Sequence, residues 1–282
     1  MSVPQTIGFL GAGQLGEPMV ERLLGAGHQV VVHTRRDAVR ARLAAGGAVA
    51  ADSVASLARD SDVLISCLFS DAQLRETGLG PDGFIDNAKP DSIFVSHTTG
   101  TLSTLEGLRD SSAKAPVILD APVSGTVESI VAGTLTVLVG GPSDAVATVT
   151  PILASYADPV LPTGALGSAL ALKLINNLLF AANAQLLGAA TQLGSRLGVA
   201  PDALLSTLQV CSAGSNAAVH AQRIGGMERF EELAGPFLRK DIAACREALG
   251  ECGVDLGLLG TAVREGPLAL DVVDSSTDGT LR

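Results

Sequence analysis

The chain has 282 residues, of which 47% are apolar and 17% charged, and its net charge is −10. The apolar share excludes a largely disordered chain. The acidic balance argues against a nucleic-acid partner, because phosphate binding needs a basic surface. A chain of this length favours two domains over one.

No membrane span, targeting segment or metal site is expected. Apolar runs stay shorter than the roughly 18 uninterrupted residues that indicate a span. The N-terminal stretch lacks the charged region and cleavage site of a signal peptide. Cys67, Cys211, Cys245 and Cys252 have no C-x-x-C spacing and no histidine pair nearby. We therefore expect neither a metal nor a disulfide framework, and a protein of the reducing cytoplasm without a membrane partner.

From Thr6 onward, short apolar runs alternate with helical stretches. The runs are TIGFLGAG, QVVVHTRR, VLISCLF, SIFVSHT, PVILDAPVSG and TLTVLVGG. Such alternation predicts a parallel sheet with crossover helices. We expect an α/β fold whose residues 1–162 form a Rossmann-type dinucleotide-binding domain.

The first turn reads G-A-G-Q-L-G, with glycines at 11, 13 and 16. A G-x-G-x-x-G run alone is weak evidence, but here it follows a strand and opens a helix, which makes it strong. The first glycine permits the tight turn, the second lets the backbone approach a pyrophosphate, and the third lets helix and strand pack closely. The candidate cofactor-binding residues of this turn are Gly11, Gly13, Gln14, Leu15 and Gly16.

The end of the second strand favours NADP over NAD. An NAD site usually has Asp or Glu there to bind the ribose 2′-hydroxyl, whereas this chain has Thr34, Arg35 and Arg36. Two guanidinium groups suit a 2′-phosphate, although arginines also occur there as solvated charges. NAD remains open as a second cofactor. Asp37 is interpreted as the N-cap of the next helix rather than as a ribose ligand.

Two loops follow strands at the edge where open α/β sheets bind ligands. Leu68 and Phe69, in the loop 68–71, are candidates to flank the adenosine half of the cofactor. Thr98, in the loop 96–100, has a hydroxyl that would reach the nicotinamide ribose. Each loop taken alone could equally be a helix-capping loop.

After residue 167 no strand pattern appears before the tail. Helical periodicity runs from about Ser168 to Leu197, and Pro201 opens another helix. We expect residues 163–282 to form an all-α domain for substrate binding and dimerisation, ending in a polar tail. The long apolar helix indicates a homo-oligomer, a dimer or tetramer, although burial within one chain would use the same residues.

Four segments in order resemble the β-hydroxyacid dehydrogenase family, which includes 3-hydroxyisobutyrate dehydrogenase and semialdehyde reductases. They are the glycine turn, D-A-P-V-S-G-T at 120–126 with G-T-L-T-V-L-V-G-G at 133–141, the K-x-x-N-N run at 173–177, and Lys240 followed by Asp241. The resemblance spans nearly the whole chain. It implies hydride transfer between NADP(H) and a short β-hydroxyacid or its semialdehyde.

The resemblance also implies roles for individual residues. Lys173 would be the catalytic acid/base, and Asn177 would orient the lysine or the substrate. Lys240 would lie near the nicotinamide. The substrate carboxylate would be held by Ser124, Gly125 and Thr126. A lysine held away from water agrees with this role, because desolvation lowers its pKa towards neutrality.

The chain departs from the family pattern at several positions. Thr126 replaces a glycine that usually follows S-G, Ala169 replaces a glycine ahead of the lysine, and Ser96 replaces an aspartate. His97 is interpreted as a loop histidine rather than a second acid, because no partner for it is evident. His220 and Arg223, one helical turn apart, either help to select the substrate or are exposed polar residues.

Two alternatives remain beside the dehydrogenase. An imine reductase shares the architecture but tends to have another residue at the lysine position, so Lys173 counts against it. A non-catalytic NADP-binding protein would have lost the lysine or the carboxylate loop, and both are present. Phosphogluconate dehydrogenase has a far longer chain and a histidine in its lysine motif, so it is set aside.

Overall fold

The computed structural model describes residues 5–251 and 253–270, so Cys252 and the predicted polar tail, residues 275–282, lie outside the described residues. The chain divides into two compact units, Met1–Lys173 and Leu174–Arg282, which we call the first and the second unit. The predicted boundary between residues 162 and 163 lies earlier in the chain, and we retain it as a proposal for where the domains separate.

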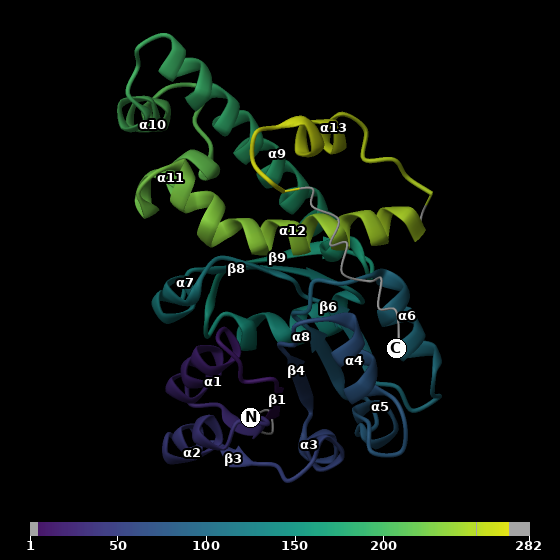
Figure 1. The fold of residues 1–282 in the computed structure, drawn as a ribbon. Coiled ribbons are helices and arrows are strands. Elements are labelled where there is room, and N and C mark those ends of the chain that lie inside the picture. Colours follow the sequence, from purple (N-terminus) through teal and green to yellow (C-terminus); the bar gives the residue numbers. More distant parts are fainter. Residues whose placement is uncertain (1–4, 252, 271–282) are drawn as a thin grey trace, which may run out of the picture. The chain divides into compact units, whose positions relative to one another are not determined.

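The described residues of the first unit form one sheet, whose strands lie between Thr6 and Gly164 (Figure 1). Its strands are β1 (Thr6–Leu10), β2 (Gln29–His33), β3 (Val49–Ala50), β4 (Val63–Ser66), β5 (Ile93–Ser96), β6 (Val117–Asp120), β7 (Val123–Ser124), β8 (Leu135–Gly140) and β9 (Ala157–Gly164). The order is β3-β2-β1-β4-β5-β6-β8-β7, with β9 paired to β8. Strands β1 to β6 are parallel, and β8 pairs antiparallel with β6 and β7. The order reverses beside β1, where ligands of such sheets bind.

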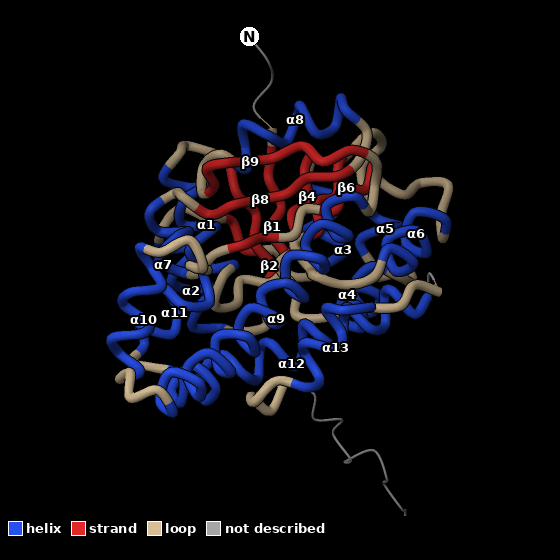
Figure 2. Tube along the Cα trace, turned by 90° about the horizontal axis from the view of Figure 1, so that it is seen from above, coloured by secondary structure: helices blue, strands red, loops and turns tan. Residues whose placement is uncertain are grey.

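Helices cover both faces of this sheet, and in Figure 2 they surround the strands drawn in red. They are α1 (Gly16–Gly25), α2 (Asp37–Ala45), α3 (Val54–Asp60), α4 (Asp71–Gly78), α5 (Phe84–Asn87), α6 (Leu102–Asp110), α7 (Val127–Ala132) and α8 (Ser143–Leu153). Successive strand residues point to opposite faces. Phe9 and Ile65 share a core with α1, α2, α7 and α8, whereas Leu10 and Leu64 share one with α3 to α6. The predicted Rossmann-type α/β fold is confirmed.

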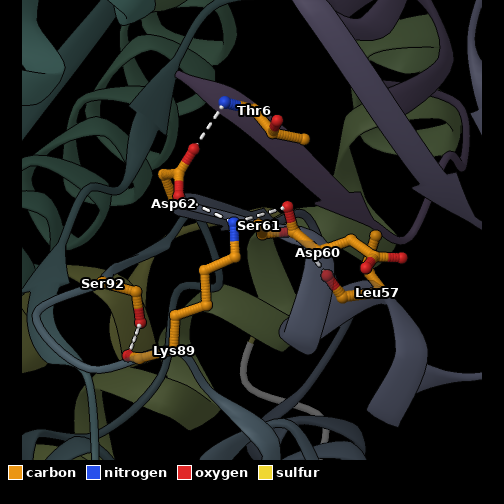
Figure 3. A network of polar contacts seen from close by, with 7 residues as sticks. All are labelled: Thr6, Leu57, Asp60, Ser61, Asp62, Lys89 and Ser92. Atoms are coloured by element: carbon orange, nitrogen blue, oxygen red, sulfur yellow. Dashed lines mark hydrogen bonds and ion pairs between the residues drawn. The ribbon is translucent and has the colours of Figure 1, made fainter. Parts of the chain in front are cut away.

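At the amino ends of the strands, a carboxylate links three segments (Figure 3). Asp62, ahead of β4, accepts hydrogen bonds from the Thr6 N–H and from Lys89 Nζ, both at 2.8 Å. Lys89 also donates to the carbonyl oxygen of Asp60. Burial alone would raise the pKa of Asp62, but the bonds from Lys89 and Thr6 outweigh it and lower the pKa. This network fastens the end of the sheet opposite to the carboxyl ends of the strands.

The second unit is helical in its described residues, which confirms the predicted all-α part. The long helix α9 (Ser168–Arg196) begins in the first unit and continues into the second, and it is followed by α10 (Pro201–Val210), α11 (Asn216–Ile224), α12 (Met227–Glu251) and α13 (Gly257–Glu265). The helix predicted from about Ser168 to Leu197 and the helix start at Pro201 are both confirmed. Leu178, Phe230, Ile242 and Val263 share the core of this unit.

A buried glutamine on α9 fixes the segment after α13. Gln185 Nε2 donates to the carbonyl oxygens of Val263 and Leu268 at 2.8 and 2.9 Å, and its Oε1 accepts from the Leu268 N–H at 2.8 Å. Every polar atom of this side chain faces a backbone group, which is what burial of an amide requires. The middle of α9 is therefore bonded directly to α13 and to the segment that follows it.

By length and composition alone, α9 could also cross a membrane. Half of its most apolar 18-residue window is buried within the structure, and the core helix of a soluble protein satisfies the same criteria. The composition of this helix is therefore weak evidence for a membrane span.

Candidate cofactor and substrate site

The three glycines of the turn between β1 and α1 have different surroundings. Gly11 has a φ of +92°, and a Cβ there would lie 2.6 Å from the carbonyl oxygen of Cys67. A Cβ at Gly16 would lie 2.3 Å from the carbonyl oxygen of Gly11. Around Gly13, in contrast, no described atom other than those of Gly13 and its two chain neighbours lies within 4 Å of a built Cβ. Helix α1 has no side-chain cap at Leu15. The N–H of Glu17 donates to the carbonyl oxygen of Gly13 and Pro18 has no N–H, so the N–H of Gly16 is the one in this turn that suits an anion.

A cavity of about 310 Å³ opens beside this turn. Its walls come from the ends of β1, β2 and β4, and the candidate residues among them are Gly11, Gly13, Thr34, Arg35, Arg36, Leu68 and Phe69. Gln14, Leu15, Gly16 and Thr98 belong to the same unit but do not line the cavity, and Lys240 lies in the second unit. The shape, the open Gly13 and the uncapped helix fit the adenosine and pyrophosphate part of a dinucleotide.

Part of the cavity wall was not foreseen from the sequence. Gln73, Glu76 and Thr77 on α4 line it together with Cys67 and Val54. The three α4 residues are spaced i, i+3 and i+4, which places them on one helical face, and this spacing was the available signal. Burial raises the pKa of the Cys67 thiol to about 12, so this cysteine stays protonated. The described residues contain no group of three or more His, Cys, Asp or Glu that could hold a metal.

At the end of β2 the structure corrects one detail. Asp37 is the first residue of α2 rather than its N-cap, and the capping position is taken by Arg36, whose side chain makes no cap bond. The carboxylate of Asp37 instead pairs with Arg40 at 2.6 Å. An acidic residue suits the first turn of a helix as well as its cap, which is why the sequence did not separate the two.

The two candidate loops after β4 and β5 are tied together. Asp71 Oδ2 accepts from the backbone N–H and the hydroxyl of Thr101, at 2.8 and 3.0 Å. Thr98 Oγ1 donates to the carbonyl oxygen of Leu68 at 3.2 Å. A Cβ on Gly100 would collide with the Asp71 carboxylate. Both loops also serve as helix starts, because Ser70 and Thr101 cap α4 and α6.

His97 lies in the loop after β5, where it is buried and has two hydrogen-bond partners that were not evident from the sequence. Its Nδ1 lies 2.5 Å from the carbonyl oxygen of Ala121, and its Nε2 lies 2.8 Å from the hydroxyl of Tyr156. A carbonyl only accepts, so Nδ1 carries the proton and Tyr156 donates to Nε2. Burial lowers the pKa of His97 to about 4, so the ring is neutral at pH 7. These partners lie 24 and 59 residues away in the sequence.

The candidate carboxylate loop starts at the end of β7. Ser124 is half-buried, and its hydroxyl has no hydrogen-bond partner among the described residues. Gly125 has a φ of +144°, which favours glycine. The hydroxyl of Thr126 donates to the carboxylate of Glu128 at 2.5 Å, and its N–H donates to Ser129 Oγ. Ser124 therefore has a hydroxyl open to a ligand, whereas the Thr126 hydroxyl is engaged within the chain.

Asp120, the last residue of β6, fixes the start of α9. It is fully buried, and its two carboxylate oxygens accept from the N–H groups of Gly167 and Leu170, each at 2.8 Å. A carboxylate at a helix N-terminus satisfies N–H groups that lack helical partners and favours the helix dipole. Lys173 follows three residues after Leu170. We assigned no role to Asp120 from the sequence.

Lys173 and Asn177 lie one helical turn apart on α9, on the same face. Lys173 is half-buried and Asn177 is buried, and Asn177 Oδ1 accepts from Asn176 Nδ2 at 3.2 Å. In the second unit, Lys240 is half-buried on α12. A surface helix would expose these polar groups more fully.

His220 and Arg223 form a pair on α11. Arg223 Nη2 lies 2.7 Å from His220 Nε2, and the imidazole ring contacts Phe180 edge to face. Burial and then the arginine charge lower the pKa of His220. His220 is thus half-buried against α9, whereas Arg223 is exposed.

Two family models cover most of the chain. Residues 6–175 match the NAD binding domain of 6-phosphogluconate dehydrogenase, and residues 167–266 match the NAD-binding domain of NADP-dependent 3-hydroxyisobutyrate dehydrogenase. Similar proteins include 2-(hydroxymethyl)glutarate dehydrogenase of Eubacterium barkeri, 31% identical over 94% of this chain and 89% of its own. The 3-hydroxyisobutyrate dehydrogenase of Pseudomonas aeruginosa is 33% identical over 76% of this chain and 72% of its own.

Solved structures give the same picture. A Mycobacterium tuberculosis 3-hydroxyisobutyrate dehydrogenase with L-serine is similar at a TM-score of 0.83 and 25% identity, covering 93% of this chain and 92% of that one. An imine reductase from Pseudomonas sp. is similar at a TM-score of 0.57 and 19% identity, covering 93% and 92%, which reflects a shared fold alone.

Proposed function

Because the chain belongs to the β-hydroxyacid dehydrogenase family and is an NAD(P)-dependent oxidoreductase that acts on CH–OH groups, we propose that it converts a short β-hydroxyacid and its semialdehyde with NADP(H). The observation that carries the proposal is a half-buried lysine, Lys173, on a helix whose start is fixed by the buried Asp120 carboxylate. The glycine turn and its cavity supply a dinucleotide site.

The bound nicotinamide supplies or takes up the hydride, and the chain supplies the proton and the binding groups. Lys173 protonates the carbonyl oxygen of the semialdehyde, or takes the hydroxyl proton in the opposite direction. Asn177, one turn on, orients the lysine or the substrate. Lys240 would lie near the nicotinamide.

A small carboxylate is the substrate class favoured by the loop after β7. The Ser124 hydroxyl, which has no partner among the described residues, would donate to one carboxylate oxygen. Gly125 would offer its backbone N–H beside it, in the manner of a turn that binds anions. Thr126, whose N–H and hydroxyl are bonded to Ser129 and Glu128, would line the carboxylate pocket, and its N–H would reach the substrate only by leaving Ser129.

NADP is the proposed preferred cofactor. Arg35 lines the cavity, and no Asp or Glu occupies the end of β2 to bind a ribose 2′-hydroxyl. A guanidinium group pairs well with the 2′-phosphate of NADP, and NAD has no such phosphate to pair with.

We also propose a homo-oligomer in the cytoplasm. Leucines at 172, 179, 186, 193 and 197 on or just after α9 are 47%, 47%, 61%, 58% and 73% exposed. They recur at intervals close to one or two helical turns, so they form an apolar stripe that a second copy of α9 would cover. Light scattering of the purified protein would test this. The cytoplasm is proposed from the cysteine spacing.

The test of function is turnover of a substrate panel with NADPH and with NADH. The panel holds glyoxylate, succinic semialdehyde, tartronate semialdehyde, methylmalonate semialdehyde and a cyclic imine. Lys173→Ala should lower kcat by about 10²- to 10⁴-fold, the range of general acid–base catalysis, while NADPH binding persists. Lys114→Ala, at an exposed loop lysine of the first unit, serves as the matched control.

Each other outcome points to a different function. Wild-type turnover by Lys173→Ala would end the acid/base assignment. Turnover of the imine alone would favour an imine reductase. Tight NADPH binding with no turnover of any compound would favour a non-catalytic NADP-binding protein.

A further inference from the structure

The two neighbouring arginines after β2 have different surroundings. Arg35 lines the cavity and forms no hydrogen bond or ion pair with the residues that the structure describes. Arg36 lines the same cavity, but its Nη2 donates to the carbonyl oxygen of Ala12 at 2.8 Å. Ala12 stands between the first two glycines of the turn and is buried. One guanidinium is thus open to a ligand, and the other is bound to the turn.

A carboxylate on α1, that of Glu17, lies beside Arg36 and forms a long ion pair with it. Glu17 Oε1 accepts from Arg42 Nε and Nη2 at 2.8 and 2.7 Å, and Glu17 Oε2 lies 3.9 Å from Arg36 Nη2. The Glu17 side chain is only 18% exposed, whereas those of Arg36 and Arg42 are 56% and 58% exposed. The best shielded charge of the cluster is therefore a carboxylate shared by two cations, which offsets part of the charge of Arg36.

The contact with Ala12 affects a part of the site common to both cofactors. A carbonyl oxygen carries partial negative charge, and an unpaired one beside a pyrophosphate would oppose binding of that anion. Arg36 pairs this oxygen and fixes the peptide next to Gly13, where the backbone leaves room for the ligand. NADP and NAD share the pyrophosphate and differ at the 2′-phosphate. The effect of Arg36 should therefore be equal for the two.

We propose that the two arginines have separate roles: Arg36 is a positioning residue that holds the glycine turn through Ala12, supported by Glu17 and Arg42, and the choice of NADP over NAD rests on Arg35. The proposal depends on the proposed function only in that the ligand is a nicotinamide dinucleotide. The arginine proposal is tested by the dissociation constants of the cofactors, whereas the proposed function is tested by turnover that depends on Lys173. Either proposal can therefore fail while the other holds.

The test is the dissociation constant of NADPH and of NADH, each measured by nicotinamide fluorescence. Arg35→Ala should weaken NADPH by about 100-fold and NADH by less than about threefold, because a charge-assisted contact with phosphate is lost. Arg36→Ala should weaken both cofactors by about tenfold, leaving their ratio within about twofold of wild type. Arg36→Lys, which keeps a donor for Ala12, should recover most of that loss.

Arg40→Ala is the matched control. Arg40 carries the same charge four residues further on, pairs with Asp37 and does not line the cavity, so both constants should stay within about twofold of wild type. If Arg36→Ala loses as much of the preference for NADPH over NADH as Arg35→Ala does, the 2′-phosphate binds to Arg36 and the proposal is overturned. Equal effects of Arg35→Ala and Arg40→Ala on NADPH would also overturn it, because the effect would then be one of net charge.

Discussion

Lowering the pH should weaken the first unit through His97. The folded pKa of about 4 lies below the ordinary value of 6.5, so between these values the unfolded chain binds more protons than the folded one. Stability is therefore full above pH 6.5 and falls as the pH drops towards 4. Each pKa unit corresponds to about 1.4 kcal/mol, and the loss between pH 7.5 and pH 4 amounts to about 3 kcal/mol. A protonated ring would also lose the hydrogen bond that Tyr156 donates to Nε2.

The assay is urea unfolding of the wild type and of His97→Gln at pH 7.5 and at pH 4. Carboxylates also titrate in this range, so the useful quantity is the difference between the two proteins. His97→Gln should be less stable at pH 7.5, because the imidazole contacts with Ala121 and Tyr156 are lost. Its deficit should shrink by about 3 kcal/mol at pH 4. A deficit that is equal at both pH values would refute the argument that His97 stays neutral because it is buried.

Two substitutions test how the site is held. Asp120→Asn replaces one acceptor oxygen by an N–H₂ group, so one buried N–H at the start of α9 loses its partner. We expect a loss of about 1–3 kcal/mol in urea unfolding and a fall in kcat of at least about tenfold with unchanged NADPH affinity; wild-type kcat would separate Asp120 from catalysis. Ser124→Ala should raise KM for acid substrates by about tenfold, the value of one hydrogen bond to a charged group. An unchanged KM would move the carboxylate site away from the loop after β7.

Local patterns were sufficient to predict the architecture. Alternating apolar runs and helical stretches predicted the parallel sheet, and the glycine spacing after β1 located the turn beside the cavity. The helix from Ser168 was predicted to within one residue of its observed end at Arg196. These features depend on neighbours within a few turns of chain, so spacing alone carries the information.

Contacts between distant segments were not predicted. Asp120 binds N–H groups that lie 47 and 50 residues away, and no spacing rule connects a strand end with a helix start at that distance. The same holds for His97 and its partners. The separate roles inferred for Arg35 and Arg36 depend on Ala12 and Glu17, which come from the preceding βα unit. Partners of this kind become evident only when the chain is folded.

The glycines of the turn serve two different purposes: two of them are needed for the fold, and the third leaves room for a ligand. Gly11 and Gly16 touch backbone on the side where a methyl group would stand, so any larger residue there damages the fold itself. Gly13 faces open space, so an alanine at this position is compatible with folding and would fill only room left for a ligand. Relatives that keep glycine at positions 11 and 16 but have a larger residue at position 13 would therefore be expected to keep the fold and to have lost dinucleotide binding.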